Sequence, residues 1–332
     1  MTLLSRRPAL VSRRSALALG GSALLLPSSL RAQAAWPTGP VTFVVGYAAG
    51  GSTDINAREL AQVMTPVIGQ TIVIDNKGGA AGSIGLRAAA AAKPDGQTLF
   101  VAVGTNVIIN PHVQKGMIDT ISSLAPVCQI TDYQYVLVVG NSVPAKNAQE
   151  LVALAKKDPE KLTYSSSGVG GNNHLAGALF ADAAGIKMTH VPYKGTGPAV
   201  ADVISGQITC NFSSLPPAVS QIKGGNLRAL AVTGNKRVKS LPDVPTLKEQ
   251  GIDVVVTSWQ GLFAPARTPD AILDKIEAAT KKGMTDPKWE AALARDGLEM
   301  PPERTRAEFT KFVADEHNFW GKKLKELKIE ME

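Results

Sequence analysis

The sequence predicts an α/β protein with two lobes. Apolar runs of strand length alternate with segments of helical periodicity from residue 40 to about residue 232, which is typical of α/β folds. The mature chain is longer than a single hydrophobic core usually organises. The segments 124–135 and 254–264 are interpreted as crossings between lobes. We therefore expect a first lobe at 36–131 plus 262–332 and a second lobe at 132–261.

Each predicted strand is a short apolar run bounded by turn residues. The first, Pro40–Gly46, reads PVTFVVG and is typical of a buried strand. The other predicted strands are Thr71–Asp75, Thr98–Val103, Tyr135–Val139, Leu162–Ser165, Met188–Val191, Ile208–Phe212 and Leu227–Val232.

The predicted helices follow these strands, and amphipathic helices make up most of the C-terminal part. Apolar residues recur in them at three- and four-residue spacing. The predicted helices are Asp54–Val67, Ser83–Ala92, Ala148–Lys157, Asn172–Ala184, Pro198–Ser205, Asp270–Met284, Pro287–Asp296 and Arg304–Leu327.

Residues 1–34 have the features of an export signal. A basic start precedes an apolar stretch at 16–26, and the small residues Ala32 and Ala34 fit a cleavage site. Arg13-Arg14 before the apolar stretch indicates the twin-arginine route, with general secretion as the alternative. Without a later run of about 20 apolar residues, the mature chain is expected to be free in the periplasm.

The net charge of the chain does not indicate a nucleic-acid partner. The formal charge is +7, but residues 1–35 contain five arginines and no acidic residue, which leaves +2 for the rest. The remaining basic residues are scattered, as in solvated helix faces.

The two cysteines, Cys128 and Cys210, lie in apolar runs and in no CxxC motif. An oxidising compartment permits a disulfide between them. Two separate buried thiols remain the other interpretation, and the sequence leaves both open.

A Gly-rich loop between a strand and a helix occurs three times, at 46–54, 165–174 and 191–198. Such a loop exposes backbone N–H groups beside the positive end of a helix dipole, which favours an anion. Loops from different lobes that face each other across a cleft would bind a carboxylate without Arg or Lys. Ordinary well-capped turns are the alternative for any single loop.

Motifs of known enzymes and metal sites do not occur. The chain lacks G-x-S-x-G, a Walker loop and a complete G-x-G-x-x-G, and its histidines lack metal-ligand spacing. Neither a cofactor nor a metal is expected. For His174, packing or capping competes with a general-base role. For Asp54, capping of its helix competes with a ligand contact, and for Trp259, hinge packing competes with ligand stacking.

In the order and spacing of its motifs, the mature chain resembles the receptor family of tripartite tricarboxylate transporters, the Bug proteins. The segments that carry the resemblance are 36–37 (WP), 40–54 (ending GGSTD), 75–82 (DNKGGAAG), 94–99 (PDGQTL), 190–195 (HVPYKG), 227–233 (LRALAVT) and 241–246 (LPDVPT).

The resemblance implies a two-lobed periplasmic-binding-protein (Venus-flytrap) fold with the ligand cleft between the lobes. It also implies a receptor that captures a small carboxylate and passes it to a membrane permease of two proteins. A monomer is the default expectation for a receptor that must open and close. Ligand contacts carried over from the family's loops are Tyr47, Ala48, Gly50, Gly51, Ser52, Asp54, Ser167, Gly168, Gly170, Gly171, Asn172, His174, Tyr193, Gly195 and Thr196.

Three departures from the family pattern bear on which acid is bound. Gly171 replaces a Thr or Ser, Ser213-Ser214 replaces an Asp-Asn pair, and Thr105-Asn106 replaces a Ser/Thr-His region. Two other functions stay open at this stage. One is a ligand-loaded co-sensor for a membrane kinase, and the other is an envelope hydrolase that uses Ser52 or Ser167 with His174.

Overall fold

The computed structural model describes residues 36–114, 116–159 and 161–326. The predicted export segment, residues 1–34, lies outside the described residues.

The strands form one hydrogen-bonded path in the order β2-β1-β3-β9-β4-β7-β5-β6, and β8 pairs with β4. Their pairing is parallel within β1, β2 and β3 and within β5, β6 and β7, while β4 and β9 run antiparallel to their neighbours. Their bounds are β1 (Val41–Val45), β2 (Ile72–Asn76), β3 (Thr98–Val103), β4 (Leu124–Gly140), β5 (Thr163–Ser166), β6 (Thr189–Pro192), β7 (Cys210–Ser214), β8 (Leu227–Val232) and β9 (Thr257–Pro265).

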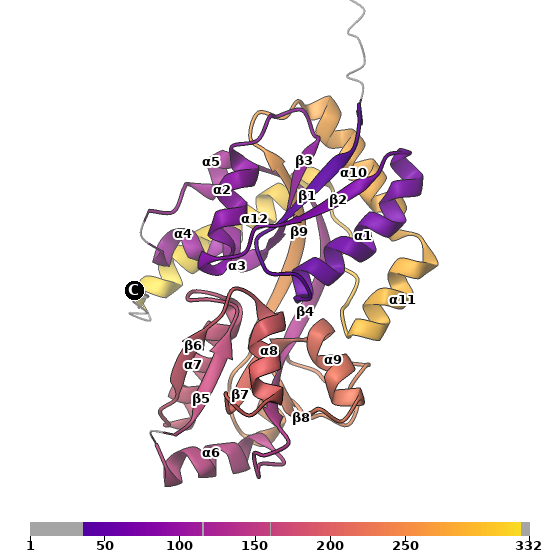
Figure 1. Cartoon of the computed structure of the whole chain (residues 1–332). Helices are drawn as coiled ribbons and strands as arrows, with labels where there is room; N and C mark the ends of the chain where they lie inside the picture. The colour runs from indigo at the N-terminus through magenta and orange to yellow at the C-terminus, as the bar shows by residue number, and fades with distance from the viewer. Residues whose placement is uncertain (1–35, 115, 160, 327–332) are drawn as a thin grey trace, which may run out of the picture. The chain divides into compact units, whose positions relative to one another are not determined.

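The long strand β4 joins the two halves of the fold. Its first part, 124–134, pairs with β9, and its second part, 135–140, pairs with β7 and β8. In Figure 1, β4 and β9 accordingly run from the group around β1, β2 and β3 toward the group around β5, β7 and β8. The lobe boundaries proposed from the sequence, at 131–132 and 261–262, fall within these two strands.

The helices cover the two groups of strands, each with its own apolar core. In the first group, Phe100, Trp259 and Phe309 belong to a buried cluster between the sheet and α2, α3 and α12. In the second group of strands, Val136 and Val203 belong to a separate buried cluster that packs against α8 and α9. The helices are α1 (Ser52–Ile68), α2 (Ser83–Ala90), α3 (Gly104–Ile108), α4 (Asn110–Val113), α5 (Thr120–Ser123), α6 (Ala148–Lys157), α7 (Asn172–Ala184), α8 (Thr196–Ile204), α9 (Leu215–Lys223), α10 (Asp270–Met284), α11 (Pro287–Asp296) and α12 (Arg306–Glu326), with short 3-10 turns η1 (Ala80–Gly82) and η2 (Lys248–Gln250).

Helix α9 is an element that the sequence analysis missed. Pro216 and Pro217 suggest a loop, but both lie in the first turn of the helix. Proline is tolerated there because the first backbone N–H groups of a helix have no partner within it.

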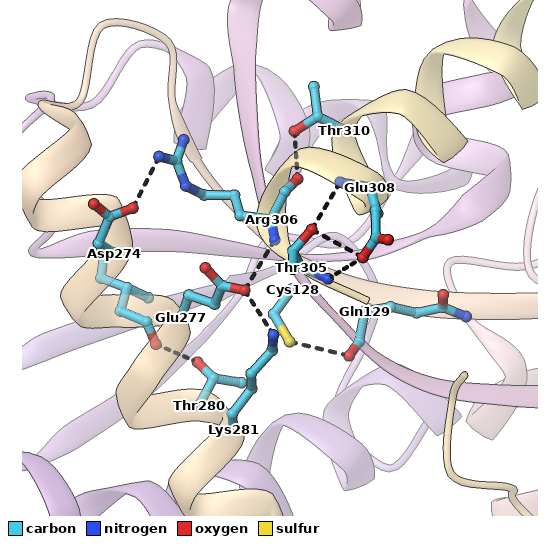
Figure 2. A network of polar contacts seen from close by, with 11 residues as sticks. Cys128, Gln129, Asp274, Glu277, Thr280, Lys281, Thr305, Arg306, Glu308 and Thr310 are labelled. Atoms are coloured by element: carbon cyan, nitrogen blue, oxygen red, sulfur yellow. Dashed lines mark hydrogen bonds and ion pairs between the residues drawn. The ribbon is translucent and has the colours of Figure 1, made fainter. Parts of the chain in front are cut away.

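Cys128 and Cys210 are free, buried thiols on β4 and β7. Cys128 lies beside the contact between α10 and the start of α12 (Figure 2). There the Glu277 carboxylate accepts a hydrogen bond from the backbone N–H of Arg306 at 2.9 Å and pairs with Lys281 at 2.8 Å. This network fixes α12 against the first half of the fold.

Candidate ligand-binding site

The first Gly-rich loop connects β1 to α1 and is held by its own acidic residue. The Asp54 carboxylate accepts hydrogen bonds from the backbone N–H of Gly50 at 2.9 Å and from Arg58 Nε at 3.1 Å. Burial opposes ionisation of Asp54, but these hydrogen bonds and the charge of Arg58 hold its pKa below the ordinary value. Asp54 therefore shapes the loop, and its charge is already paired.

Tyr47 anchors the same loop to the first half of the fold. Its buried hydroxyl accepts a hydrogen bond from Asn106 Nδ2 at 2.8 Å and lies 3.1 Å from the carbonyl of Ala81, to which it donates. Burial, opposed by the Asn106 bond, raises the pKa of Tyr47, so the phenol stays neutral.

The second loop leads from β5 into α7. Side chains of the loop and of the first turn of α7 make three hydrogen bonds. Ser167 Oγ donates to Asn173 Oδ1 at 2.6 Å, and Asn173 Nδ2 donates to the carbonyl of Phe212 at 2.9 Å. Asn172 Nδ2 donates to Ser258 Oγ on β9 at 2.6 Å. The start of α7 is therefore fixed to β7 and to β9.

The third loop leads from β6 into α8, which begins at Thr196. Tyr193 Oη donates to Asp202 Oδ2 on that helix at 2.5 Å. Tyr193 is therefore engaged within its own half of the fold, while Thr196 lies in the pocket described next.

The three loops bring the first turns of α1, α7 and α8 around one small pocket. A Cβ on Gly51, which precedes α1, would lie 3.7 Å from the backbone nitrogen of Thr196. The pocket has a volume of about 20 Å³, room for about one water molecule, so a larger ligand requires the loops to part. Its lining residues are Tyr47, Gly51, Ser52, Thr53, Val103, Thr105, Tyr133, Tyr135, Ser167, Asn172, Asn173, Thr196 and Ser214.

The electrostatics of this pocket favour an anion. Three helix N-termini, each with unpaired backbone N–H groups and a positive dipole end, surround it. Its lining contains hydroxyl and amide side chains and no Lys, Arg, Asp or Glu. A carboxylate would find hydrogen-bond donors there without a cationic side chain.

The Gly-rich loops also make contacts between the two halves of the fold. The backbone N–H of Ala48 donates to the carbonyl of Lys194 at 3.1 Å, and Gln114 Nε2 donates to the carbonyl of Val169 at 3.0 Å. A Cβ on Gly168 would lie 3.0 Å from the backbone nitrogen of Ala81. Close approach at this point accounts for a glycine in the loop.

The residues predicted from the sequence fall into three groups. Tyr47, Gly51, Ser52, Ser167, Asn172 and Thr196 line the pocket. Ala48, Gly168 and Tyr193 line a separate groove between the two halves of the fold. Gly50, Asp54, Gly170, Gly171, His174 and Gly195 lie in the loops and line neither. Their role as ligand contacts stays a prediction.

Sequence reasoning missed the two tyrosines of the pocket wall, Tyr133 and Tyr135. Both lie on β4 at a spacing of two, so their side chains share one face. The alternation of Tyr133 and Tyr135 with polar Gln134 was the signal that would have found them.

A second, larger cavity of about 560 Å³ lies between β4, β9, α7 and α12. Trp259 lines it and packs edge-on against Phe309, with ring centroids 5.6 Å apart. Asp132 and Arg304 also line it. Trp259 thus packs in the first core and also lines this larger cavity, which shares Thr105, Tyr133 and Asn172 with the small pocket. A stacking role of Trp259 against a ligand stays a prediction.

The geometry does not support the hydrolase alternative. Ser167 donates to Asn173, Ser52 Oγ accepts from Gln260 Nε2 at 3.3 Å, and His174 Nδ1 accepts from the backbone N–H of Gly170 at 3.2 Å. Neither predicted serine is hydrogen-bonded to His174 within the described residues.

No helix among residues 36–114, 116–159 and 161–326 is long and apolar enough to cross a membrane. In the same segments, no three His, Cys, Asp or Glu side chains are grouped so that they could hold a metal ion.

Comparisons with known proteins give a consistent result. Residues 56–329 match the profile of the tripartite tricarboxylate transporter family receptor. A UPF0065 protein of Agrobacterium vitis is 38% identical over 270 residues, which cover 80% of this chain and 77% of that protein.

Solved structures extend the similarity to the fold. The periplasmic binding protein BugD has a TM-score of 0.85 at 33% identity, over 89% of this chain and 99% of BugD. The R. palustris protein Rpa4515, solved with adipate, has a TM-score of 0.83 at 31% identity, over 88% of this chain and 98% of Rpa4515. These similarities confirm the predicted two-lobed α/β fold of periplasmic binding proteins.

Proposed function

Because the chain belongs to the tripartite tricarboxylate transporter receptor family, we propose that it captures a small organic acid in the periplasm and delivers it to a membrane permease of two proteins. The relatives are solute-binding proteins, so binding and release, without catalysis, are the expected chemistry. The observation that carries the proposal is the convergence of three helix N-termini on one pocket without a charged side chain.

The lining of the pocket favours the binding of an acid that carries no ammonium group. Binding an amino acid requires a partner for its ammonium, and a buried ammonium without an anionic partner is strongly disfavoured. The lining offers no Asp or Glu, and Asp54 is engaged by Arg58 and Gly50. Aspartate and glutamate are therefore expected to bind more weakly than the matching dicarboxylates.

The hydroxyl groups of the pocket lining favour the binding of a ligand with many oxygen atoms. The lining contains several aliphatic hydroxyls, among them Ser52, Thr105 and Ser214, and the phenols of Tyr133 and Tyr135. Burial raises the pKa of both phenols, so they remain neutral donors. Rpa4515 was solved with adipate, a linear dicarboxylate, and we place dicarboxylates first among the candidate ligands.

A thermal-shift panel on residues 35–332 tests the proposal. The panel contains succinate, malate, adipate, citrate, aspartate, glutamate and benzoate, with protein refolded to remove bound ligand. An acid at 100 times its Kd stabilises the folded state by about 2.7 kcal/mol, which raises Tm by about 4 °C for a chain of this length.

The outcomes separate the parts of the proposal. A shift confined to dicarboxylates supports both the receptor role and the ligand class. An equal shift with aspartate contradicts the exclusion of ammonium groups. Folded protein that responds to no acid contradicts the carboxylate receptor itself.

A further inference from the structure

Two histidines stack beneath the second Gly-rich loop. His174, in the first turn of α7, lies on His190 of β6, with ring centroids 3.9 Å apart and ring planes inclined by 12°. The ring of Tyr164 on β5 lies 5.0 Å from that of His190. The stack is built by three elements of the second half of the fold.

Each imidazole is connected to one glycine of the loop. His174 Nδ1 accepts a hydrogen bond from the backbone N–H of Gly170 at 3.2 Å. His190 Nε2 lies 2.6 Å from Ser166 Oγ, which accepts from the backbone N–H of Gly168 at 3.1 Å. Gly168 and Gly170 have φ of +135° and +80°, a backbone conformation that favours glycine at both positions.

The residue between these glycines contacts the other half of the fold. The carbonyl of Val169 accepts the hydrogen bond from Gln114, and Gly168 lies against Ala81. The loop that starts α7 at the pocket is thus also the loop that contacts the first half of the fold. A change at the histidine stack is therefore transmitted through one or two hydrogen bonds to the pocket and to the contact with the first half of the fold.

Protonation would change the contact at His174. Burial lowers the pKa of His174, and burial together with the charge of His174 lowers the pKa of His190 to about 4. The titratable groups packed beside the stack are Tyr164 and, behind it, Cys210, whose pKa values burial raises, so both are neutral. At neutral pH, His174 Nδ1 is therefore free to accept.

A proton on that nitrogen turns the acceptor into a donor that faces the N–H of Gly170. Since His190 resists protonation more strongly, the first proton goes to His174. The neighbouring ring then opposes a second charge, because like charges at this separation repel.

We propose that His174 and His190 are positioning residues of the loop 166–171, and that a proton on His174 releases Gly170 and weakens ligand binding in acid. The inference rests on the proposed receptor function, because it concerns how the same pocket is held closed. In this proposal the two histidines hold the loop in place and do not contact the ligand.

The first test needs no ligand. Nitrogen-15 spectra of the imidazoles in the mature protein at pH 7.5 should show His174 with its proton on Nε2 and an accepting Nδ1. On acidification, the amide resonance of Gly170 should move with the titration of His174. Two results would overturn the inference, whatever the ligand proves to be. One is a proton on Nδ1 of His174 at pH 7.5, and the other is a Gly170 amide resonance that does not move as His174 titrates.

The second test measures binding, with adipate as the probe, by calorimetry at pH 7.5, 6.5 and 5.5. Loss of one neutral hydrogen bond corresponds to about 3- to 10-fold in affinity. Because burial lowers the pKa of His174, the ring is partly protonated at pH 5.5, and the wild type should lose up to that much relative to His174→Gln between pH 7.5 and 5.5. His174→Gln keeps an acceptor that does not titrate, so its affinity should change with pH only as far as adipate itself takes up protons. His174→Phe keeps a stacked ring without an acceptor and should already be weakened at pH 7.5.

His317→Gln is the matched control, because His317 belongs to a separate ring pair with His112, and it should follow the wild type at each pH. A His174→Gln protein with the wild-type pH profile overturns the inference. Absence of adipate binding by the wild type at pH 7.5 counts against adipate as a ligand, and the imidazole spectra then decide the positioning role alone.

Discussion

Gln114 and Val169 are joined by a hydrogen bond between the two halves of the fold, from the side-chain Nε2 of Gln114 to the carbonyl oxygen of Val169 over 3.0 Å. Gln114 is itself oriented by Ser83, whose hydroxyl donates to Gln114 Oε1 at 2.7 Å. The bond connects the first half of the fold to the second Gly-rich loop. The bond therefore stabilises the arrangement in which the two halves are in contact.

Gln114→Ala should therefore weaken binding while it leaves the fold intact. Loss of one such bond corresponds to about 3- to 10-fold in affinity, measured by calorimetry with the acid that gives the largest thermal shift. Gln221→Ala on α9, whose side chain accepts from Asn226 far from the pocket, serves as the control. Equal affinity in the two variants would show that the bond does not contribute to closure.

Gly51→Val should block the pocket. Gly51 has φ −80° and ψ 167°, which any residue adopts, but its Cβ would lie 3.3 Å from the carbonyl oxygen of Ala48 and 3.7 Å from the backbone nitrogen of Thr196, so the loop must shift by a few tenths of an ångström. We expect the ligand-induced thermal shift to disappear in a protein that still folds, with a lower Tm without ligand. Gly39→Val, whose Cβ would meet only the end of Gln97, should keep the shift. A retained shift in Gly51→Val would place the ligand elsewhere.

The sequence predicted the strand–loop–helix units well because their information is local. Gly51, Ser52 and Asn172 stand where a buried strand gives way to a helix, and the structure places all three in the pocket lining. Composition and periodicity suffice for such units, since a strand end and a helix start need no distant partner.

Contacts between distant segments were beyond sequence reasoning. Asn106 holds Tyr47, 59 residues away, and Ser258 accepts from Asn172, 86 residues away. Nothing near Asn106 or Ser258 in the chain indicates these partners. The same holds for the stack of His174 on His190, which depends on how α7 crosses β6.

Both thiols should be inert in the folded protein. Burial raises the pKa of Cys128 and of Cys210 to about 12, so the reactive thiolate is scarce at neutral pH. A thiol reagent such as dithionitrobenzoate should label neither cysteine in native protein and both after denaturation, and reductant should leave Tm unchanged. A mass lower by two hydrogens in unreduced protein would instead demonstrate a disulfide between them.

Asp132→Asn should stabilise the protein at neutral pH. Burial raises the pKa of Asp132 to about 6, against the attraction of Arg304 and a hydrogen bond from Gln129. The unfolded chain ionises this carboxyl near pH 4, so the folded state is the one that holds the proton between about pH 4 and 6. The contribution of Asp132 to stability is therefore favourable in acid, declines as pH rises through this window, and is least at pH 7.5.

An asparagine keeps an acceptor for Gln129 and carries no charge to desolvate. Because the side chain is partly exposed, we expect a gain of roughly 1–2 kcal/mol in the free energy of unfolding at pH 7.5, measured by urea titration. At pH 4.5 the gain should shrink, since the wild-type carboxyl is then mostly protonated in the folded state. Asp253→Asn, at a side chain 86% exposed, should show no such pH-dependent gain. A loss of stability in Asp132→Asn that is equal at both pH values would mean that attraction to Arg304 outweighs burial, and that the carboxylate stabilises the junction of β4 and α12.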